Sequence, residues 1–147
     1  MMLTLLISGL LTQAAPVAVE RTPFNVEVPA VEHVTADPTC GGRVGMSAIA
    51  TCFATTQAGA ATAVDAFDAD FTNHGWLAAD GSNNRIIYVK RKAEGGCEAF
   101  QLLAFAGEGA AAAPAAPAYI ALAAIPGDIC VASPATSPIS AAPLAPQ

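Results

Sequence analysis

Four cysteines are the residues whose chemistry constrains this chain most, namely Cys40, Cys52, Cys97 and Cys130. Structural zinc sites usually bring cysteines in close pairs such as C-x2-C, and no two cysteines stand that close here. An even number of cysteines behind an apolar leader is instead typical of disulfide bonds in an exported protein. We therefore predict two disulfides, with no metal site and no cofactor.

Two histidines, His33 and His74, are the candidates for a general base. A nucleophilic enzyme needs a thiol or hydroxyl beside such a base, together with a group that orients it. His74 is expected at a helix end next to a glycine, and His33 lies in a proline-rich segment that offers no rigid platform. We predict no catalytic residue. A small secreted hydrolase or metal-dependent enzyme is the alternative, and it would require a cleft that gathers His74 with acids or thiols.

The charged residues exclude one class of function. The net charge of −6 argues against a nucleic-acid-binding protein, which needs a basic face to neutralise phosphates. The only basic cluster, Lys90-Arg91-Lys92, could meet an anionic surface or an acidic partner, or could be the solvated end of a hairpin. Asp65, Asp68 and Asp70 concentrate the acid, and a solvated helix face explains them more simply than a cation site.

The N-terminal residues have the pattern of a signal peptide. The apolar run in Met1–Leu11 is too short to span a bilayer, and Thr12-Gln13-Ala14 supplies small residues for cleavage after Ala14. No Lys or Arg precedes the run, so either the true start lies upstream or the signal is an unusual one. A buried N-terminal strand or helix is a further alternative. We predict a signal peptide at 1–14, export to the periplasm or the extracellular space, and no membrane span in the mature chain.

The rest of the chain divides by composition. Residues 15–38 are rich in proline and predict an extended arm, with an edge strand at Phe24–Val28. Residues 132–147 carry prolines, alanines and no charge, which predicts a disordered tail. One small domain remains at 39–131, with few large apolar residues for its core. The alanine-rich, lysine-poor usage is typical of a bacterial sequence.

Two helices are predicted at the start of this domain. Arg43–Thr56 places apolar side chains near helical spacing. Ala60–His74 shows the pattern more clearly, because Val64, Phe67 and Phe71 form one stripe. Gly75 then follows as a C′ residue that can adopt a positive φ.

The second half of the domain has the alternation of strands. Trp76–Ala79 and Arg85–Arg91 predict a hairpin around a turn of about five residues. Cys97–Ala106 predicts the next strand, and Tyr119–Ile125 suits either a strand or a helix. The predicted fold is an α+β domain in which two N-terminal helices pack on an antiparallel meander of three or four strands and disulfides staple the layers.

The pairing of the cysteines is left open. Cys97 and Cys130 fall at neighbouring strand ends, which favours a bridge between them. That bridge forces Cys40–Cys52, which is awkward if Cys52 lies about 13 Å along a helix. We expect helix-to-sheet bridges instead, one from Cys40 and one from Cys52, without choosing their partners.

Bulky apolar residues occupy both faces of the predicted sheet, and two short helices can cover only one. Either the proline- and alanine-rich segments cover the second face, or it stays open as an interaction surface. We predict a non-catalytic binding module that meets a protein partner or a second copy through the sheet; a structural cell-envelope protein is a further alternative. The candidate binding residues are Tyr88, Phe100 and Leu102 on one face and the basic Lys90 and Arg91, while Ile87, Val89, Leu103 and Phe105 form the opposite face.

Overall fold

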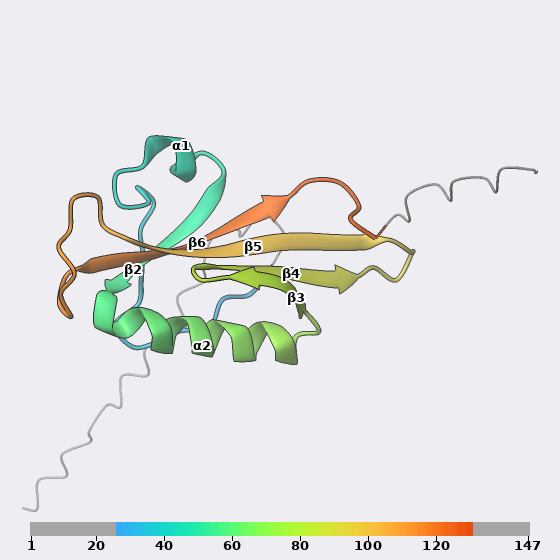
Figure 1. Cartoon of the computed structure of the whole chain (residues 1–147). Coiled ribbons are helices and arrows are strands. Elements are labelled where there is room, and N and C mark those ends of the chain that lie inside the picture. The colour runs from blue at the N-terminus through green and yellow to red at the C-terminus, as the bar shows by residue number, and fades with distance from the viewer. Residues whose placement is uncertain (1–25, 131–147) are drawn as a thin grey trace, which may run out of the picture.

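The computed structural model of the chain describes residues 26–130 (Figure 1). The predicted signal peptide at 1–14, the first part of the predicted arm and the predicted tail at 132–147 lie outside the described residues. Within 26–130, six strands form one antiparallel sheet in the order β1-β2-β6-β5-β4-β3. The elements along the chain are β1 (Thr35–Ala36), α1 (Val44–Ser47), β2 (Ala50–Thr56), α2 (Gln57–Asn73), β3 (Leu77–Ser82), β4 (Arg85–Arg91), β5 (Cys97–Ala106) and β6 (Pro117–Ile125).

The predicted arrangement of two N-terminal helices on a meander of three or four strands is wrong. The sheet has six strands, and α2 is the only long helix of the described residues. α1 is a single turn of four residues and lies on the opposite side of the sheet from α2 (Figure 1). The structure is therefore an antiparallel sheet with one helix along one face and a short helical loop over part of the other.

The segment Arg43–Thr56, predicted as a helix, contains the main error. Ala50–Thr56 forms β2, which pairs with β1 on one side and with β6 on the other. The near-helical spacing of Val44 and Ile49 marks no buried stripe, because both side chains are exposed. Threonines and Phe53 favour a strand, and hydrogen bonding to two neighbouring strands outweighs the local periodicity.

The second predicted helix is confirmed as α2, which begins and ends close to the predicted residues. Thr56 is extended and its hydroxyl accepts a hydrogen bond from the Gly59 amide at 3.1 Å, so it caps the helix N-terminus. Gly75 has a φ of 84°, and the Trp76 amide then donates to the Phe71 carbonyl at 3.0 Å. The C-terminal glycine thus ends the helix as expected and turns the chain into β3.

The strands of the second half follow the sequence pattern, with two refinements. The β3–β4 turn contains only Asn83 and Asn84, because Ser82 already pairs with Arg85. Pro117–Ile125, the segment that suited either state, is the strand β6 between β2 and β5. Pairing on both sides of β6 overrides the helix preference of its alanines.

The main hydrophobic core lies between α2 and the sheet. Phe71 of the helix meets Tyr88 of β4 and Phe100 of β5 edge to face, and Phe67 meets Phe53 of β2 in the same way. Valines of the predicted arm also reach this core: Val26 is buried, and Val28, Val31 and Val34 pack beside it. The expected edge strand at Phe24–Val28 is not seen in residues 26–28, and Thr35–Ala36 pairs with β2 instead.

The cysteines pair as Cys40–Cys52 and Cys97–Cys130, with Cα–Cα distances of 5.1 Å and 5.3 Å. The prediction of two disulfides is confirmed, and the expectation of helix-to-sheet bridges is wrong. Cys52 lies on a strand and not on a helix, which removes the objection to the Cys40–Cys52 bridge. The Asp37 amide donates to the Cys52 carbonyl at 2.8 Å, so the chain before Cys40 already runs beside β2.

Candidate functional site

Three of the predicted binding residues, Tyr88, Phe100 and Leu102, lie in the core beneath α2. Each is at most 1% exposed. The Tyr88 and Phe100 rings are stacked with centroids 5.0 Å apart, and both contact Phe71 of the helix. In this structure a partner cannot reach them, so any binding surface of the sheet belongs to the opposite face.

Tyr88 carries the polar contact that joins the sheet to the side of α2. Its hydroxyl donates a 2.7 Å hydrogen bond to Oδ1 of Asp68. Burial first, and then this hydrogen bond and the negative charge of Asp68, raise the pKa of Tyr88 far above its ordinary value. The phenol therefore stays protonated and fixes Asp68 against the sheet.

The two predicted basic residues point to different faces, because side chains alternate along β4. Lys90 lies on the α2 side, where its Nζ sits 5.6 Å from the centre of the Trp76 ring. Arg91 lies on the other side and is exposed. Of the five predicted binding residues, only Arg91 is thus on the face away from the helix.

That opposite face keeps an uncovered apolar strip over β3, β4 and β5. Val89 pairs with Leu77 on one side and Ala99 on the other, and Ile87 pairs with Gln101, so their side chains project together. Among the described elements, β3 and β4 contact only each other, β5 and α2. Leu77 is 67% exposed and Ile87, Val89 and Gln101 are partly exposed, whereas Ala99 between Val89 and Ile125 is fully buried. We call this surface the open face: Leu77, Ile87, Val89, Gln101 and Ile125.

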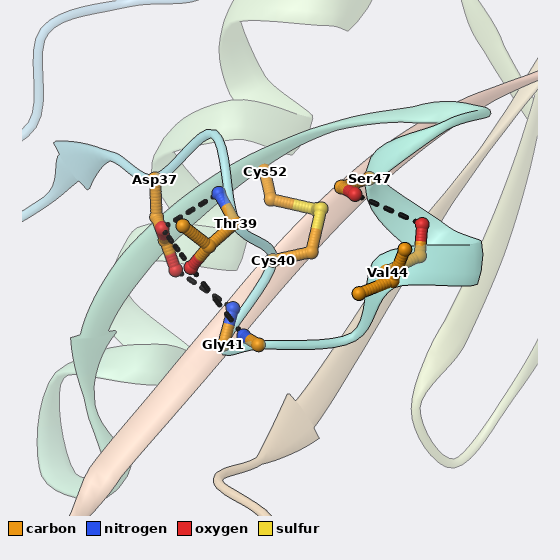
Figure 2. The surroundings of a disulfide bond; sticks show 8 residues. Asp37, Thr39, Cys40, Gly41, Val44, Ser47 and Cys52 are labelled. Carbon is orange, nitrogen blue, oxygen red and sulfur yellow. Dashed lines mark hydrogen bonds between the residues drawn. A yellow bond between two sulfur atoms is a disulfide. The ribbon is translucent and has the colours of Figure 1, made fainter.

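The remainder of this side of the sheet is covered by the segment 37–49, which we call the stapled loop. Cys40, Cys52 and Ala121 form a second buried cluster under it, with Met46 and Phe105 packed alongside. The Asp37 carboxylate accepts hydrogen bonds from the Thr39 hydroxyl and amide and from the Gly41 amide, all between 2.7 and 2.9 Å (Figure 2). The Thr39 contact first, and then the Gly41 amide, lower the pKa of Asp37.

Close packing fixes the loop on the sheet. Gly41 has a φ of 66°, and a Cβ there would collide with the Tyr119 ring. Beyond this contact the loop projects two apolar side chains into solvent, Val44 at 81% and Ile49 at 68% exposure. The disulfide and Asp37 therefore hold these side chains on a rigid support beside the open face. Asp37 was missed from the sequence, although an Asp two residues before a Thr-Cys-Gly-Gly run is a turn signal.

Three arginines surround the apolar surface. Arg85 and Arg91 stand at the two ends of β4 on the side of the open face, and both are exposed. The Arg43 guanidinium lies 4.4 Å from the centre of the Phe105 ring, which stacks on Tyr119. None of these arginines pairs with a carboxylate of a described residue. On the same side, β2, β4, β5 and β6 carry no acidic side chain, whereas Asp80 of β3 pairs with Ile87 and so lies on this side.

Acidic side chains gather instead beside α2. Two adjoining hollows of about 450 and 460 Å³ separate the helix from the β3–β4 hairpin. Val64, Asp65 and Ile86 line both, and Asp68 lines one of them beside Asp65. The arginine-flanked open face and this acidic groove therefore lie on opposite sides of the sheet.

The histidines form no catalytic arrangement within residues 26–130. His74 caps α2: its Nδ1 lies 2.8 Å from the Asp70 carbonyl oxygen and 3.2 Å from Oδ2 of the same residue. His33 contacts the neighbouring Glu32 in an exposed turn. Neither ring has a hydrogen bond with a serine, threonine or cysteine of the described residues. The arrangement gives no support to the alternative of a hydrolase.

One pair of cysteines lies beside a carboxylate, a group that can bind a metal ion. Cys97, Asp128 and Cys130 place their sulfur and carboxylate atoms within 4.8 Å of one another. Both sulfurs are bonded to each other, so they are not thiolates in this state. Asp128 Oδ1 accepts hydrogen bonds from the amides of Cys97 and Cys130 at 2.8 and 3.0 Å.

Comparisons with known proteins add no identity, since no family model, curated protein or solved structure matches this chain. In residues 26–130 there is no helix with the length and apolar character that crossing a membrane requires. The two disulfides are compatible with an exported protein.

Proposed function

We propose that the protein is an exported binding module without catalytic chemistry of its own, and that the open face is its binding surface. The observation that carries this proposal is the absence of a covering layer over β3 and β4 in residues 26–130, which leaves Leu77 two-thirds exposed beside Ile87 and Val89. Contiguous exposed apolar surface of this kind marks interaction sites in folded proteins.

The charged residues around the open face indicate the chemistry of its partner. An apolar centre with arginine at its edge is the usual composition of a protein–protein interface. Arg43, Arg85 and Arg91 have no acidic partner within the described residues, so an acidic group on another protein can pair with them. A protein partner with apolar side chains among carboxylates therefore fits this face better than a basic one.

Export is supported by the disulfides and by the apolar leader at Met1–Leu11. Both bonds form between residues that the fold brings within about 5 Å, so they are expected to form wherever the compartment is oxidising.

The test removes apolar side chains of the open face and keeps residue types that favour strands. The triple variant Leu77→Thr, Ile87→Thr and Val89→Thr keeps side chains that favour a strand and removes the apolar strip. Immobilised wild-type protein is expected to retain a partner from the compartment into which it is exported, and the triple variant to lose it. Ala69→Ser, on the exposed side of α2, is the matched control and should retain the partner.

Two results would contradict the proposal. One is equal retention of the same partner by the wild type and a folded triple variant. The other is a wild-type protein that retains no partner and remains monomeric on a sizing column at high concentration. Circular dichroism and a non-reducing mass map establish that each variant is folded with both disulfides formed.

A further inference from the structure

The corner formed by Cys97, Cys130 and Asp128 shares no residue with the open face, although Cys97 pairs with Arg91 at its border. Cys97 begins β5, and the other two residues follow β6 in the chain. Their two sulfur atoms, which the disulfide holds together, and one carboxylate oxygen lie within 4.8 Å of one another, so the three groups can reach a common ion once the sulfurs are released. We call this group the Asp128 corner.

We propose that the Asp128 corner is a redox-gated site for a zinc-type divalent cation. The disulfide closes the site in the oxidised protein. A dithiol reductant opens it, and the two released sulfurs and the Asp128 carboxylate then bind the ion.

Access separates this disulfide from the other one. Cys40 and Cys52 are 0% and 3% exposed, whereas the other bond joins Cys97, which is 1% exposed, to Cys130, which is exposed at the surface. Thiol–disulfide exchange requires a thiolate to reach one of the bonded sulfurs. A dithiol can therefore attack Cys130 in the folded protein, while Cys40–Cys52 must first be uncovered by unfolding.

The opening step is ordinary thiol–disulfide exchange. A thiolate of the dithiol attacks Sγ of Cys130, and Sγ of Cys97 leaves as a thiolate and takes up a proton. The second thiol of the reductant then attacks the reductant sulfur of the mixed disulfide, and Cys130 leaves as a thiol. The protein gains two electrons and two protons, and the dithiol becomes a cyclic disulfide. Metal binding afterwards releases the two thiol protons.

Asp128 keeps the two cysteines together when the bond is open. Its Oδ1 accepts hydrogen bonds from both cysteine amides, and these contacts involve the backbone and not the sulfur atoms. Gly96, with a φ of 76°, lets the carboxylate lie against the backbone, because a Cβ at this position would overlap Oδ2. The Cα–Cα distance of 5.3 Å is therefore expected to persist after reduction, so the ligands need only rotate about their side-chain bonds.

The ligand chemistry selects the ion. Two thiolates and one carboxylate suit zinc, which takes sulfur at about 2.3 Å and oxygen at about 2.0–2.2 Å in a tetrahedron. The two sulfurs of such a site lie about 3.8 Å apart. After reduction, rotation of the exposed Cys130 side chain can bring the sulfurs to this separation. No fourth histidine, cysteine or acid of the described residues joins the group, so water completes the coordination.

The experiment uses the full chain and Co²⁺ as a spectroscopic probe for zinc. The protein is treated with dithiothreitol without denaturant, separated from it under nitrogen and titrated with Co²⁺. Mass mapping after alkylation is expected to show Cys97 and Cys130 opened and Cys40–Cys52 intact. One equivalent of Co²⁺ should then produce the near-ultraviolet absorption of cobalt–thiolate bonds, and Zn²⁺ should displace it.

Two aspartate variants make the assignment specific. Asp128→Asn retains an oxygen that can accept both amide hydrogen bonds but is a poor metal ligand, so Co²⁺ affinity should fall at least about tenfold. Asp37→Asn, beside the other disulfide, is the matched control and should leave the affinity unchanged.

Each contrary result overturns the proposal. The two disulfides could open at equal rates in the folded protein, which would remove the gate. The reduced wild type could fail to bind Co²⁺, or Asp128→Asn could bind it as tightly as the wild type, and either result would remove the three-ligand site. None of these results bears on the open face, which does not share a residue with the Asp128 corner.

Discussion

Both faces of the sheet carry apolar side chains, but only the α2 face carries buried aromatic rings and is covered along its main strands. Tyr88 and Phe100 are buried under α2, which runs for seventeen residues beneath the sheet. On the other face the stapled loop covers the β2 side, and the neighbouring Ile87, Val89 and Leu77 stay partly or largely exposed. Burial on the second face therefore follows the reach of the covering element: Cys52 and Ala121 under the stapled loop are buried, and Leu77 beyond it is exposed.

The strongest test of the comparison removes one side chain from each face. Phe100→Ala should lower the free energy of unfolding by about 3–5 kcal/mol, because it leaves a cavity among Phe71, Trp76 and Tyr88. Val89→Ala, on the open face, should cost about 1 kcal/mol, since the side chain is only partly buried. Urea unfolding with the disulfides intact measures both, and equal costs would contradict the difference between the faces.

A smaller effect is expected from the polar contact between the covered face and α2. Tyr88→Phe removes the hydrogen bond to Asp68 and should cost about 1.5 kcal/mol, at the low end for a bond to a charged group, because Asp68 is partly exposed. Since folding raises the pKa of Tyr88, its contribution is complete below the ordinary value of about 10 and is lost as the pH rises through the folded value.

The contribution of Tyr88 to stability can be measured separately at alkaline pH. The wild type should lose stability relative to Tyr88→Phe above about pH 10, where unfolding lets the phenol ionise. Urea midpoints of the two proteins between pH 7 and pH 11 follow the loss. A constant difference over this range would show that Tyr88 is not held in the protonated form by the fold.

The stapled loop, which covers part of the second face, should respond to acid. Its Asp37 carboxylate has a lowered pKa because it accepts the Thr39 and Gly41 hydrogen bonds. The stabilisation is therefore present above the ordinary value of about 3.9 and is lost as the pH falls through the folded value. Hydrogen exchange of the Gly41 amide should accelerate relative to the core below about pH 4 in the wild type. In Asp37→Asn the same amide should show no such step, and a step of equal size there would exclude Asp37 as its origin.

Much of this fold could be predicted from the sequence where the local signals agree with the tertiary structure. The stripe of Phe67 and Phe71 with Gly75 behind it predicts α2, and alternation predicts β4 and β5. The helix predicted over Arg43–Thr56 failed because a strand with neighbours on both sides tolerates almost any spacing of apolar residues. The expectation of helix-to-sheet disulfides came from that error, because it placed Cys52 on a helix, whereas the strand ends alone favoured Cys97–Cys130.

The binding surface was predictable only in part, for a related reason. The sequence shows that two faces are apolar, but register and cover decide which one is buried, and both are tertiary properties. Tyr88, Phe100 and Leu102 were therefore assigned to a surface that α2 covers. Ile87 and Val89 were recognised as the opposite face, whereas Leu77 lies before a bulge that no local pattern predicts.

The smallest change in stability, and the sharpest test of the open face, is expected at Leu77 alone. The side chain is 67% exposed at the edge of the sheet, so Leu77→Thr should change the free energy of unfolding by less than about 0.5 kcal/mol. If the face binds a partner, the same substitution should still weaken that binding, because a side chain exposed in the free protein becomes buried in the complex. Urea unfolding and partner retention are measured on the same preparation. A loss of stability above about 1 kcal/mol would mean that Leu77 is covered in solution, and the face would then not be open.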